Sequence, residues 1–261
     1  MAGISTNFNS MIGARLFSEM SQSLNRSMER LATGKRINRA SDDPSGAIAV
    51  SAFKQEQSRL TAQIQGQERE MKRLGAYEGA SSVVADQLTE LQGLLTSAAN
   101  TGGLSVEERE AMSMQATAII KTIDHLAMST RFEGQDILQG MASVKLGGMG
   151  EFTLSEFRDG GKLNLVDGDL EKAQLVLGFA SDQVNNAISS SGNRIKSLEH
   201  EVQSELKQLE EQEGARSLIE DADIAHEVST MVRKQVLQQA AAFAMSLFSK
   251  TESDTVLHLL G

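Results

Sequence analysis

The residues that come nearest to a catalytic motif are His226 and Glu227, in the segment HEVST that ends at Thr230. A zinc protease needs the pattern HExxH, because a second histidine one helical turn further on completes the pair of imidazole ligands. Thr230 stands at that position here. The other histidines (125, 200 and 258) are scattered, and the absence of cysteine excludes a thiol nucleophile, a disulfide framework and a thiolate metal site. The sequence therefore predicts no catalytic site, no metal site and no cofactor.

The stretch LATGKRINRASDDPSG (residues 31–46) contains residues that are typical of helix ends and helix starts. Gly34 is a helix terminator, and Lys35 and Arg36 suit the negative end of a helix dipole. Asp42 and Asp43, followed by the single proline at position 44, form a helix start, because an Asp side chain accepts hydrogen bonds from the free amides and Pro at the first helical position wastes no N–H group. The stretch is predicted to stop one helix and start another.

The segments at the two ends of the chain are apolar, and the first of them leads directly into the stretch 31–46. Apolar residues recur every three or four positions in the first segment, at Ile4, Phe8, Ile12, Leu16, Met20, Leu24, Met28 and Leu31. Most steps are of four residues, which is more than one helical turn, so the apolar stripe winds around the helix. One edge of the last segment is lined by Leu218, Ala222, Ala225, Val228, Val232, Val236, Ala240, Phe243 and Leu247, with Ile219, Ile224, Met231 and Leu237 on neighbouring faces. A helix apolar on so much of its circumference is expected to be buried in an assembly or a membrane.

Three long helices are predicted between these segments, over about residues 44–100, 105–129 and 170–212. The first two carry a coiled-coil spacing, at Val84, Leu88, Leu91, Leu95 and Ala98, and at Met112, Ala116, Ile119, Ile123 and Leu126. The third has a buried edge that includes Leu177, Ala180, Val184, Leu198, Val202, Leu206 and Leu209. Ser105 with Glu108 forms a capping box, and Ser217 with Glu220 is interpreted as a second one that opens the last helix.

Strand character is confined to residues 130–167. The segment VKLGGMGEFTL (residues 144–154) places glycines between two short alternating runs and predicts a β-hairpin, at about residues 143–155. These glycines do not lead from a strand into a helix, so a phosphate-binding loop is a weak interpretation. The predicted fold class is mainly α: a long antiparallel helical bundle or coiled coil with a small hairpin region and paired N- and C-terminal helices.

Composition limits the partners. Aromatic residues make up 4% of the chain, so a core must come from aliphatic side chains on helices packed side by side. A formal net charge of −10 argues against nucleic acid as the main partner. No apolar run approaches the roughly 20 residues that span a bilayer, and the first residues lack the features of a cleaved signal peptide. No membrane insertion is expected.

Two motifs at opposite ends of the chain resemble those of bacterial flagellins. RINRASDDPSGAIA (residues 36–49) resembles the inner-spoke segment of that family, usually RINSAxDDAAGxAI. SLIEDADIAHEVSTMVRKQVLQQAA (residues 217–241) resembles its C-terminal segment, SRIEDADYAxEVSxxxxxQILQQA. Pro44 and Ser45 stand in place of the usual Ala pair, Ile224 in place of Tyr, and Gly261 in place of a common Arg. None of these differences disturbs the helical pattern.

The resemblance implies a structural subunit that self-assembles into the bacterial flagellar filament and is exported by the flagellar type III route without a cleaved signal peptide. It implies four regions: 1–35 and 214–261 in the helical layer of the inner tube, 36–46 as a spoke linker, and 47–213 as a helical middle domain. Fewer than 40 residues separate the helical arms, too few for the variable outer domains of longer flagellins. Implied partners are further copies of the chain, an export chaperone at the C-terminal segment, and filament-cap and hook-junction proteins.

The helical pattern and the resemblance together select candidate assembly residues. They are Ile4, Phe8, Ile12, Leu16, Leu24, Leu31, Arg36, Asn38, Asp42, Asp43, Pro44, Ile219, Asp221, Val228, Val232, Leu237, Phe243 and Leu247. Two alternatives stay open: a hook–filament junction protein, which shares the spoke motif, and a type III secretion translocator. The C-terminal motif fits flagellin better than a junction protein. Arg233 and Lys234 interrupt the stretch that a translocator would insert.

One more segment resembles a functional part of some flagellins. Flagellins that strongly activate the innate cell-surface receptor for flagellin carry a sequence like LQRVREL on the first middle helix. Residues 88–94 (LTELQGL) align with it. Leu88, Leu91 and Leu94 keep the apolar positions, whereas Glu90 stands in place of a central Arg. The resemblance implies a receptor-like segment whose charge is reversed.

Overall fold

The computed structural model describes residues 3–99, 103, 105–138, 143–146 and 150–260, with side chains described over 11–99, 103, 105–138 and 153–247. The chain divides into two compact units. The terminal unit consists of residues 1–61 and 207–261, and the bundle unit consists of residues 62–206. Helices α2 (Pro44–Ala99) and α4 (Leu170–Glu220) contribute residues to both units.

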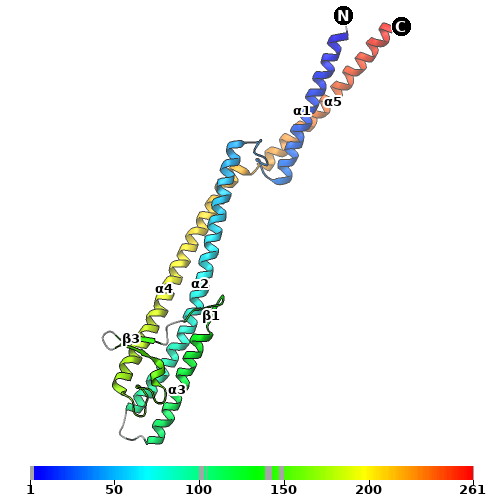
Figure 1. Cartoon of the computed structure of the whole chain (residues 1–261). Helices are drawn as coiled ribbons and strands as arrows, with labels where there is room; N and C mark the ends of the chain where they lie inside the picture. Colours follow the sequence, from blue (N-terminus) through cyan, green and yellow to red (C-terminus); the bar gives the residue numbers. More distant parts are fainter. Residues whose placement is uncertain (1–2, 100–102, 104, 139–142, 147–149, 261) are drawn as a thin grey trace. The chain divides into compact units, whose positions relative to one another are not determined.

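The terminal unit pairs the two ends of the chain. Helix α1 (Gly3–Thr33) lies beside α5 (Ile224–Leu260), and both chain ends lie at the same end of the pair (Figure 1), so the two helices are antiparallel. The start of α2 and the end of α4 complete the unit. The predicted pairing of N- and C-terminal helices is therefore confirmed, as is the mainly α fold class.

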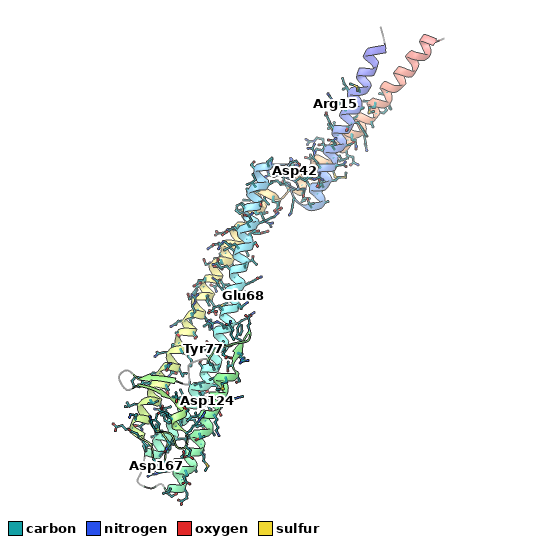
Figure 2. The ribbon with its side chains drawn as sticks, viewed as in Figure 1. Arg15, Asp42, Glu68, Tyr77, Asp124 and Asp167 are labelled. Atoms are coloured by element: carbon teal, nitrogen blue, oxygen red, sulfur yellow. The ribbon has the colours of Figure 1, made fainter. Side chains whose placement is uncertain are left out.

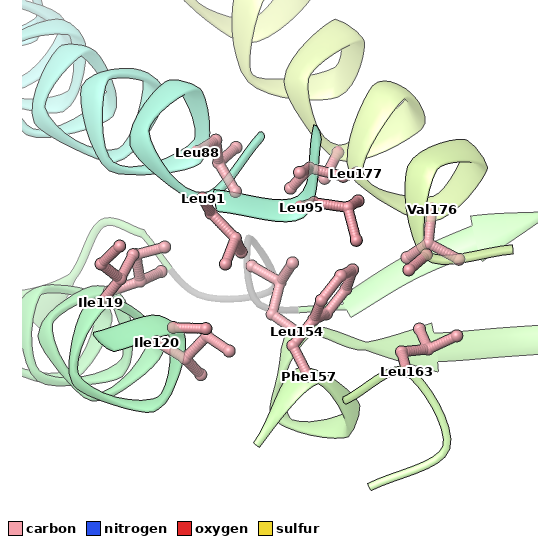
Figure 3. Packing of buried hydrophobic residues seen from close by; sticks show 14 of the residues in the cluster. Leu88, Leu91, Leu95, Ile119, Ile120, Leu154, Phe157, Leu163, Val176 and Leu177 are labelled. Carbon is pink, nitrogen blue, oxygen red and sulfur yellow. The ribbon is translucent and has the colours of Figure 1, made fainter. Parts of the chain in front are cut away.

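The bundle unit packs α2 and α4 with α3 (Val106–Ser129) and the short 3-10 helix η1 (Leu154–Phe157) around one apolar core. The α2 positions with coiled-coil spacing are all buried, and Leu88, Leu91 and Leu95 are fully so. Figure 3 shows these leucines facing Ile119 and Ile120 of α3, with Leu154 and Phe157 of η1 between the helices. The seams predicted on α2 and α3 are thus confirmed as core.

Two small antiparallel hairpins follow α3. The predicted hairpin is formed by β3 (Ser143–Leu146) and β4 (Gly150–Thr153), and the residues between the strands lie outside the described part. A second hairpin, β1 (Arg131–Phe132) with β2 (Gln135–Asp136), was not predicted. Its two-residue turn, Glu133 and Gly134, has positive φ at both positions (50° and 82°), as a type I′ turn requires.

One helix boundary differs from the sequence prediction. Helix α4 continues through Gly214 to Glu220 rather than ending near residue 212, and the capping box that Ser217 and Glu220 were expected to form is wrong. The Ser217 hydroxyl donates to Asp221, 2.6 Å away, and the Glu220 carboxylate forms an ion pair with Lys35. Asp223 caps α5 instead: its carboxylate accepts the backbone N–H of His226 at 3.0 Å. The capping box of Ser105 and Glu108 at the start of α3 is confirmed.

One residue predicted on the buried edge of α4 is placed differently. Leu206 is 48% exposed, whereas Leu198 and Val202 of the same edge are buried. The neighbouring Glu205 is the buried residue, and its carboxylate accepts hydrogen bonds from the Gln63 and Gln67 side chains of α2. A polar pair has therefore replaced an apolar one at this level of the α2–α4 contact.

Candidate assembly site: the helix junction and the paired terminal helices

The α1–α2 loop and the α4–α5 loop of the terminal unit are joined by backbone hydrogen bonds. Lys35 and Asp221 form an isolated antiparallel bridge. The backbone N–H of Arg36 donates to the Glu220 carbonyl at 2.6 Å, and the N–H of Ala222 donates to the Gly34 carbonyl at 2.9 Å. The Arg36 guanidinium also donates to the Ile219 carbonyl, 2.9 Å away. Two of the quoted motifs, far apart in the sequence, thus form one junction.

Two aspartates shape the first of these loops, and one of them, Asp43, caps a helix as the sequence predicted. Asp42 Oδ2 accepts the backbone N–H groups of Asn38 and Arg39 at 3.2 and 3.0 Å, which closes the loop on itself. Asp43 caps α2: its Oδ1 accepts the N–H of Gly46 at 2.9 Å, and Pro44 is the first helical residue. The Gly46 N–H, and then the Ser45 hydroxyl, lower the pKa of Asp43 because both stabilise the carboxylate.

Glycine is required at position 46. A Cβ there would lie 2.5 Å from both Asp43 Oδ2 and Ile37 Cδ1. Ile37 is buried, so its side chain has little room to move away. Side chains at this position would force the cap or the apolar anchor of the loop out of place.

A buried carboxylate lies at the centre of the junction. Glu220 is 3% exposed, and its Oε1 is 2.8 Å from Lys35 Nζ and 3.0 Å from Lys54 Nζ. Arg216 approaches the other oxygen at 3.2 Å. Burial alone raises the pKa of Glu220, but the hydrogen bonds and charges of the two lysines outweigh it and lower the pKa overall. This residue links the α1–α2 loop, α2 and α4 by charge.

Sequence reasoning missed that role because Glu220 was interpreted as a cap. A signal was present: Lys35 and Lys54 fall on either side of the spoke motif, and Glu220 falls inside the C-terminal motif. Only the pairing of the two loops shows which carboxylate the lysines meet. Lys35 binds this carboxylate as well as following the end of α1.

The contact between α1 and α5 includes several polar side chains. Lys234 donates from Nζ to the Ser27 hydroxyl at 2.9 Å and to the Ser23 carbonyl at 3.3 Å. The Gln238 amide donates to the Ser21 hydroxyl at 2.8 Å. Ser27 is fully buried here, and hydrogen bonding is what makes its burial tolerable.

The same contact continues towards both ends of the pair. Nearer the junction, Arg30 lies 3.8 Å from the carboxylate of Glu227, which is 7% exposed. Nearer the chain ends the helices approach closely, because a Cβ on Gly13 would lie 3.0 Å from Met245 Cγ. Small and polar residues therefore contribute to the pair along the length over which side chains are described, alongside half-buried apolar side chains such as Met20, Leu24 and Met231.

Many large apolar side chains of the pair face outwards. The exposed members are Met11 (66%), Leu16 (43%), Met28 (45%), Ile224 (48%), Val228 (42%), Val232 (50%), Val236 (59%), Leu237 (48%), Phe243 (66%) and Leu247 (49%). Of the other predicted assembly residues, Ile12, Leu24, Leu31 and Ile219 are half-buried, and the side chains of Ile4 and Phe8 lie outside the described part. The apolar edge predicted on the last helix is thus solvent-facing in the single chain.

The receptor-like segment belongs to the bundle unit. Leu88 and Leu91 are fully buried in its core and Leu94 is half-buried, as the coiled-coil spacing predicted. Glu90 is exposed on the outer side of α2. The segment therefore exposes Glu90 and not its leucines.

The two residues that come nearest to a catalytic motif, His226 and Glu227, make structural contacts. The His226 N–H is used in capping α5, and Glu227 faces Arg30. Among the described residues, no group of three His, Asp or Glu side chains is placed to hold a metal ion. No helix in the described part is both long and apolar enough to cross a membrane. The described residues thus form a helical protein with an uncovered apolar surface.

The comparisons with known proteins identify the family. The bacterial flagellin N-terminal helical region matches residues 4–143, and the bacterial flagellin C-terminal helical region matches residues 168–260. The chain belongs to the bacterial flagellin family, which is a family of structural proteins. The resemblance seen in the two terminal motifs is therefore confirmed.

Some relatives match this chain over almost their whole length, and others are longer proteins that it matches only in part. The chain is 28% identical to the flagellar filament 30.7 kDa core protein of Treponema maltophilum, over 98% of this chain and 99% of that protein. It is 30% identical to polar flagellin F of Vibrio parahaemolyticus and to flagellin A of Vibrio anguillarum, of which it spans only 36% and 48%. A crystal structure of Bacillus cereus flagellin aligns with a TM-score of 0.44 and 20% identity, over 54% of this chain and 88% of that chain.

Proposed function

We propose that this chain is the structural subunit of a bacterial flagellar filament and that it polymerises through the outward apolar side chains of α1 and α5. The observation that carries the proposal is the arrangement of the terminal pair, with polar residues such as Lys234 and Ser27 inside and residues such as Val232 and Phe243 outside. Fully burying one such side chain contributes about 1.5–3 kcal/mol. Neighbouring subunits are the natural source of that burial.

The outward residues suit a lattice better than a closed dimer. At about 100° per residue, Met11, Leu16 and Met28 of α1 point in three directions more than about 100° apart. Val228, Val232, Val236, Phe243 and Leu247 form a broad stripe on α5, and Leu237 lies on another face. A C2 dimer would cover one face of each helix, whereas a helical filament surrounds each subunit with several neighbours.

Electron microscopy of the purified protein, concentrated stepwise, tests the proposal. We expect filaments above a critical concentration. A leakage assay with dye-loaded liposomes is the matched test of the translocator alternative. Leakage without filaments would contradict the proposal. Filaments without leakage would support it.

We further propose that the terminal segments, residues 1–35 and 220–261, are largely unfolded in the dilute monomer and become helical on assembly. Ordering a backbone costs about 1–2 kcal/mol per residue, and a helical pair with its apolar side chains in water recovers too little of that cost. Limited proteolysis is the measurement: the segments should be cleaved in dilute monomer and protected in filaments. Protection in the monomer would contradict the idea.

The remaining partners follow from the same exposed surface. An export chaperone bound to the C-terminal segment would cover the apolar residues of α5 until export, which we propose occurs through the flagellar type III channel. At the ends of the filament, cap and hook-junction proteins would meet the same residues. A chain lacking residues 220–261 should lose chaperone binding in a pull-down, whereas one lacking residues 1–35 should keep it.

A further inference from the structure

A polar layer in the contact between α2 and α4 has no part in the assembly surface described above. It lies within the bundle unit, close to where that unit ends at residues 62 and 206. Glu205 of α4 is 8% exposed, and its Oε1 accepts hydrogen bonds from the side-chain amides of Gln63 and Gln67 on α2, the second at 3.1 Å. Glu68, labelled in Figure 2, marks this level on α2. A carboxylate therefore occupies the inside of a contact between two helices.

The layer is incompletely hydrogen-bonded. Glu205 Oε2 and Gln67 Oε1 are both buried without a hydrogen-bond partner, and two acceptor oxygens cannot satisfy each other. Arg194 of α4 does not supply the missing donor, because its guanidinium pairs with Glu201 at 3.2 Å. Buried acceptors without a donor cost free energy. The observed packing is therefore less favourable at this level than a fully paired or a fully apolar one.

An apolar residue stands next to this carboxylate in the sequence and lies outside the contact. Leu206 is 48% exposed. The buried and half-buried positions of this part of α4 follow alternating steps of four and three residues, which is coiled-coil spacing. They are Val184, Ile188, Ser191, Ile195, Leu198, Val202, Glu205 and Leu209. The spacing thus places Glu205 in the seam and Leu206 beside it.

A second packing would keep the same seam on either side of the layer. Val202 and Leu209 are seven residues apart, and the seam position between them can fall after three residues, at Glu205, or after four, at Leu206. These two side chains lie about 100° apart around the helix, so a local turn of α4 by about 50° exchanges them while Val202 and Leu209 still face α2. Ile64 of α2 is buried in the turn between the two glutamines and offers apolar cover to Leu206.

The gains and losses of the two packings oppose each other. The observed packing keeps the hydrogen bonds from Gln63 and Gln67, but it leaves two buried acceptors unpaired and half of Leu206 in water. The second packing gives up those hydrogen bonds, returns the carboxylate to water and buries Leu206. Free-energy changes of these kinds are of similar size. A small change in either is therefore enough to reverse the preference.

We propose that this layer is a two-state element, in which a local turn of α4 exchanges Glu205 for Leu206 in the contact with α2. The observed state has Glu205 inside. Loss of the amide donors favours the second state, and a partner that covers Leu206 from outside favours the first. The element therefore lets a contact on the outer side of α4 set the local packing of the bundle. It does not rest on the proposed filament function.

The distance between two nitroxide labels tests the proposal. The chain contains no cysteine, so labels attach only where one is introduced. Gln65 of α2 and Gln203 of α4 are exposed beside the layer, and Gln65→Cys with Gln203→Cys supplies the two attachment points. Double electron–electron resonance of the full-length monomer measures their separation. A turn of about 50° moves a side chain by about 5 Å, because a helix with its side chains has a radius of about 5–6 Å.

Removing the donors should drive the exchange. In the labelled protein, Gln63→Ala with Gln67→Leu should shift the label distance by about 5 Å as Leu206 turns inwards. The matched control adds Glu205→Leu with Leu206→Glu to that variant, which keeps the composition and places the leucine at the seam position. It should restore the original distance. An unshifted distance in the first variant would overturn the proposal, and so would a shift that persists in the control.

A second measurement guards against misfolding of the donor variant. Glu205→Leu with Leu206→Glu in the otherwise unaltered chain places an apolar residue in the seam and the carboxylate in water. Its urea unfolding midpoint should rise, because replacing a buried charged group by an apolar one of similar volume is often stabilising. Its label distance should stay that of the unaltered layer. A lower midpoint would mean that the hydrogen bonds of Glu205 outweigh its burial, and the second state would then be out of reach.

Discussion

The terminal pair and the bundle core place similar side chains in opposite ways. In the bundle, Leu88, Leu91 and Leu95 have no exposed surface. In the terminal pair, Val232 and Phe243 are 50% and 66% exposed, while Ser27 is fully buried. The bundle completes its core within one chain. The terminal pair leaves its apolar surface exposed, so under the proposed mode of assembly stability and polymerisation depend on different parts of the same chain.

Substitutions in the exposed apolar surface of α5 should have the largest effect of all, and that effect should be on assembly. Replacing Val228, Val232 and Phe243 by Ser removes three side chains worth about 1.5–3 kcal/mol each when buried. The critical concentration for filament formation should rise by more than about a thousandfold, because each 1.4 kcal/mol is tenfold. Sedimentation of polymer measures this. Thermal unfolding of the bundle should not change.

The control for that experiment alters exposed polar positions of the same helix, Gln235→Ser with Gln239→Ser. It should leave the critical concentration nearly unchanged. Equal losses of polymer in the two variants would mean that α5 acts through its helicity and not through its apolar side chains.

The second prediction concerns a substitution that should affect folding stability and not assembly. Leu91→Ala should lower the free energy of unfolding of the bundle by about 2–5 kcal/mol, because it leaves a cavity in a packed core. Leu237→Ala, at a position that is 48% exposed, should cost much less in the monomer and act on polymerisation instead. Urea unfolding followed by circular dichroism compares the two. Similar losses in both variants would contradict the division between stability and assembly.

The third prediction concerns the junction, which resembles the bundle in having a buried centre but uses charge. Glu220→Gln should destabilise the junction by about 1.5–3 kcal/mol, the range for hydrogen bonds to charged groups. Faster hydrogen exchange at the Arg36 and Ala222 amides, which join the two loops, would report it in filaments, where the terminal segments are proposed to be folded.

The junction should also weaken in acid. The pKa of Glu220 is lowered in the folded state from an ordinary value of 4.5, so its contribution is complete above that pH and is lost as the pH falls through the folded-state pKa. The protection factors of the same two amides, which are their exchange rates corrected for the intrinsic rate at each pH, should fall below about pH 4.5. Glu220→Gln should flatten this part of the profile, and an unchanged profile would exclude Glu220 as its cause.

The fourth prediction concerns the outer face of the bundle. We expect this protein to activate the animal cell-surface flagellin receptor poorly, and Glu90→Arg to improve activation by at least about tenfold, since an interface Arg often contributes 2 kcal/mol or more. Purified monomer in a reporter-cell assay measures this, with Asp86→Arg as an exposed control on the same helix. Full activity of the unaltered protein would refute the prediction.

The smallest expected effect concerns the β1–β2 turn. Glu133 has a φ of 50°, which costs a residue with an ordinary side chain about 1–2 kcal/mol. Glu133→Asn should raise the free energy of unfolding by about 0.5–1 kcal/mol, because Asn-Gly suits a type I′ turn and the ion pair lost to Arg69 is exposed. Gly134→Ala should have the opposite sign. Urea unfolding of both variants provides the measurement.

Local signals in the sequence were enough for most of the secondary structure. The caps at Asp43 and Ser105 and the coiled-coil positions from Val84 to Ala98 depend on residues within a few turns of one another. The Ser217 cap failed although its local signal was as good, because Glu220 gains more from Lys35 and Lys54 than from capping a helix. The β1–β2 turn was missed because Glu133 is an unusual residue at positive φ.

By itself, the sequence determined that the chain is helical, that its two ends are apolar, and that its motifs belong to the flagellin family. Helix periodicity and capping depend on neighbours in the chain, so they can be read from it. Only the tertiary structure decided which side of α5 turns inwards, because that depends on α1, about 200 residues away. Both sides carry apolar residues, and the choice went to the side where Lys234 and Gln238 meet the serines of α1. A buried polar group needs a hydrogen-bond partner, whereas an apolar side chain can be buried against many surfaces, so the polar residues restrict which side of α5 can face α1.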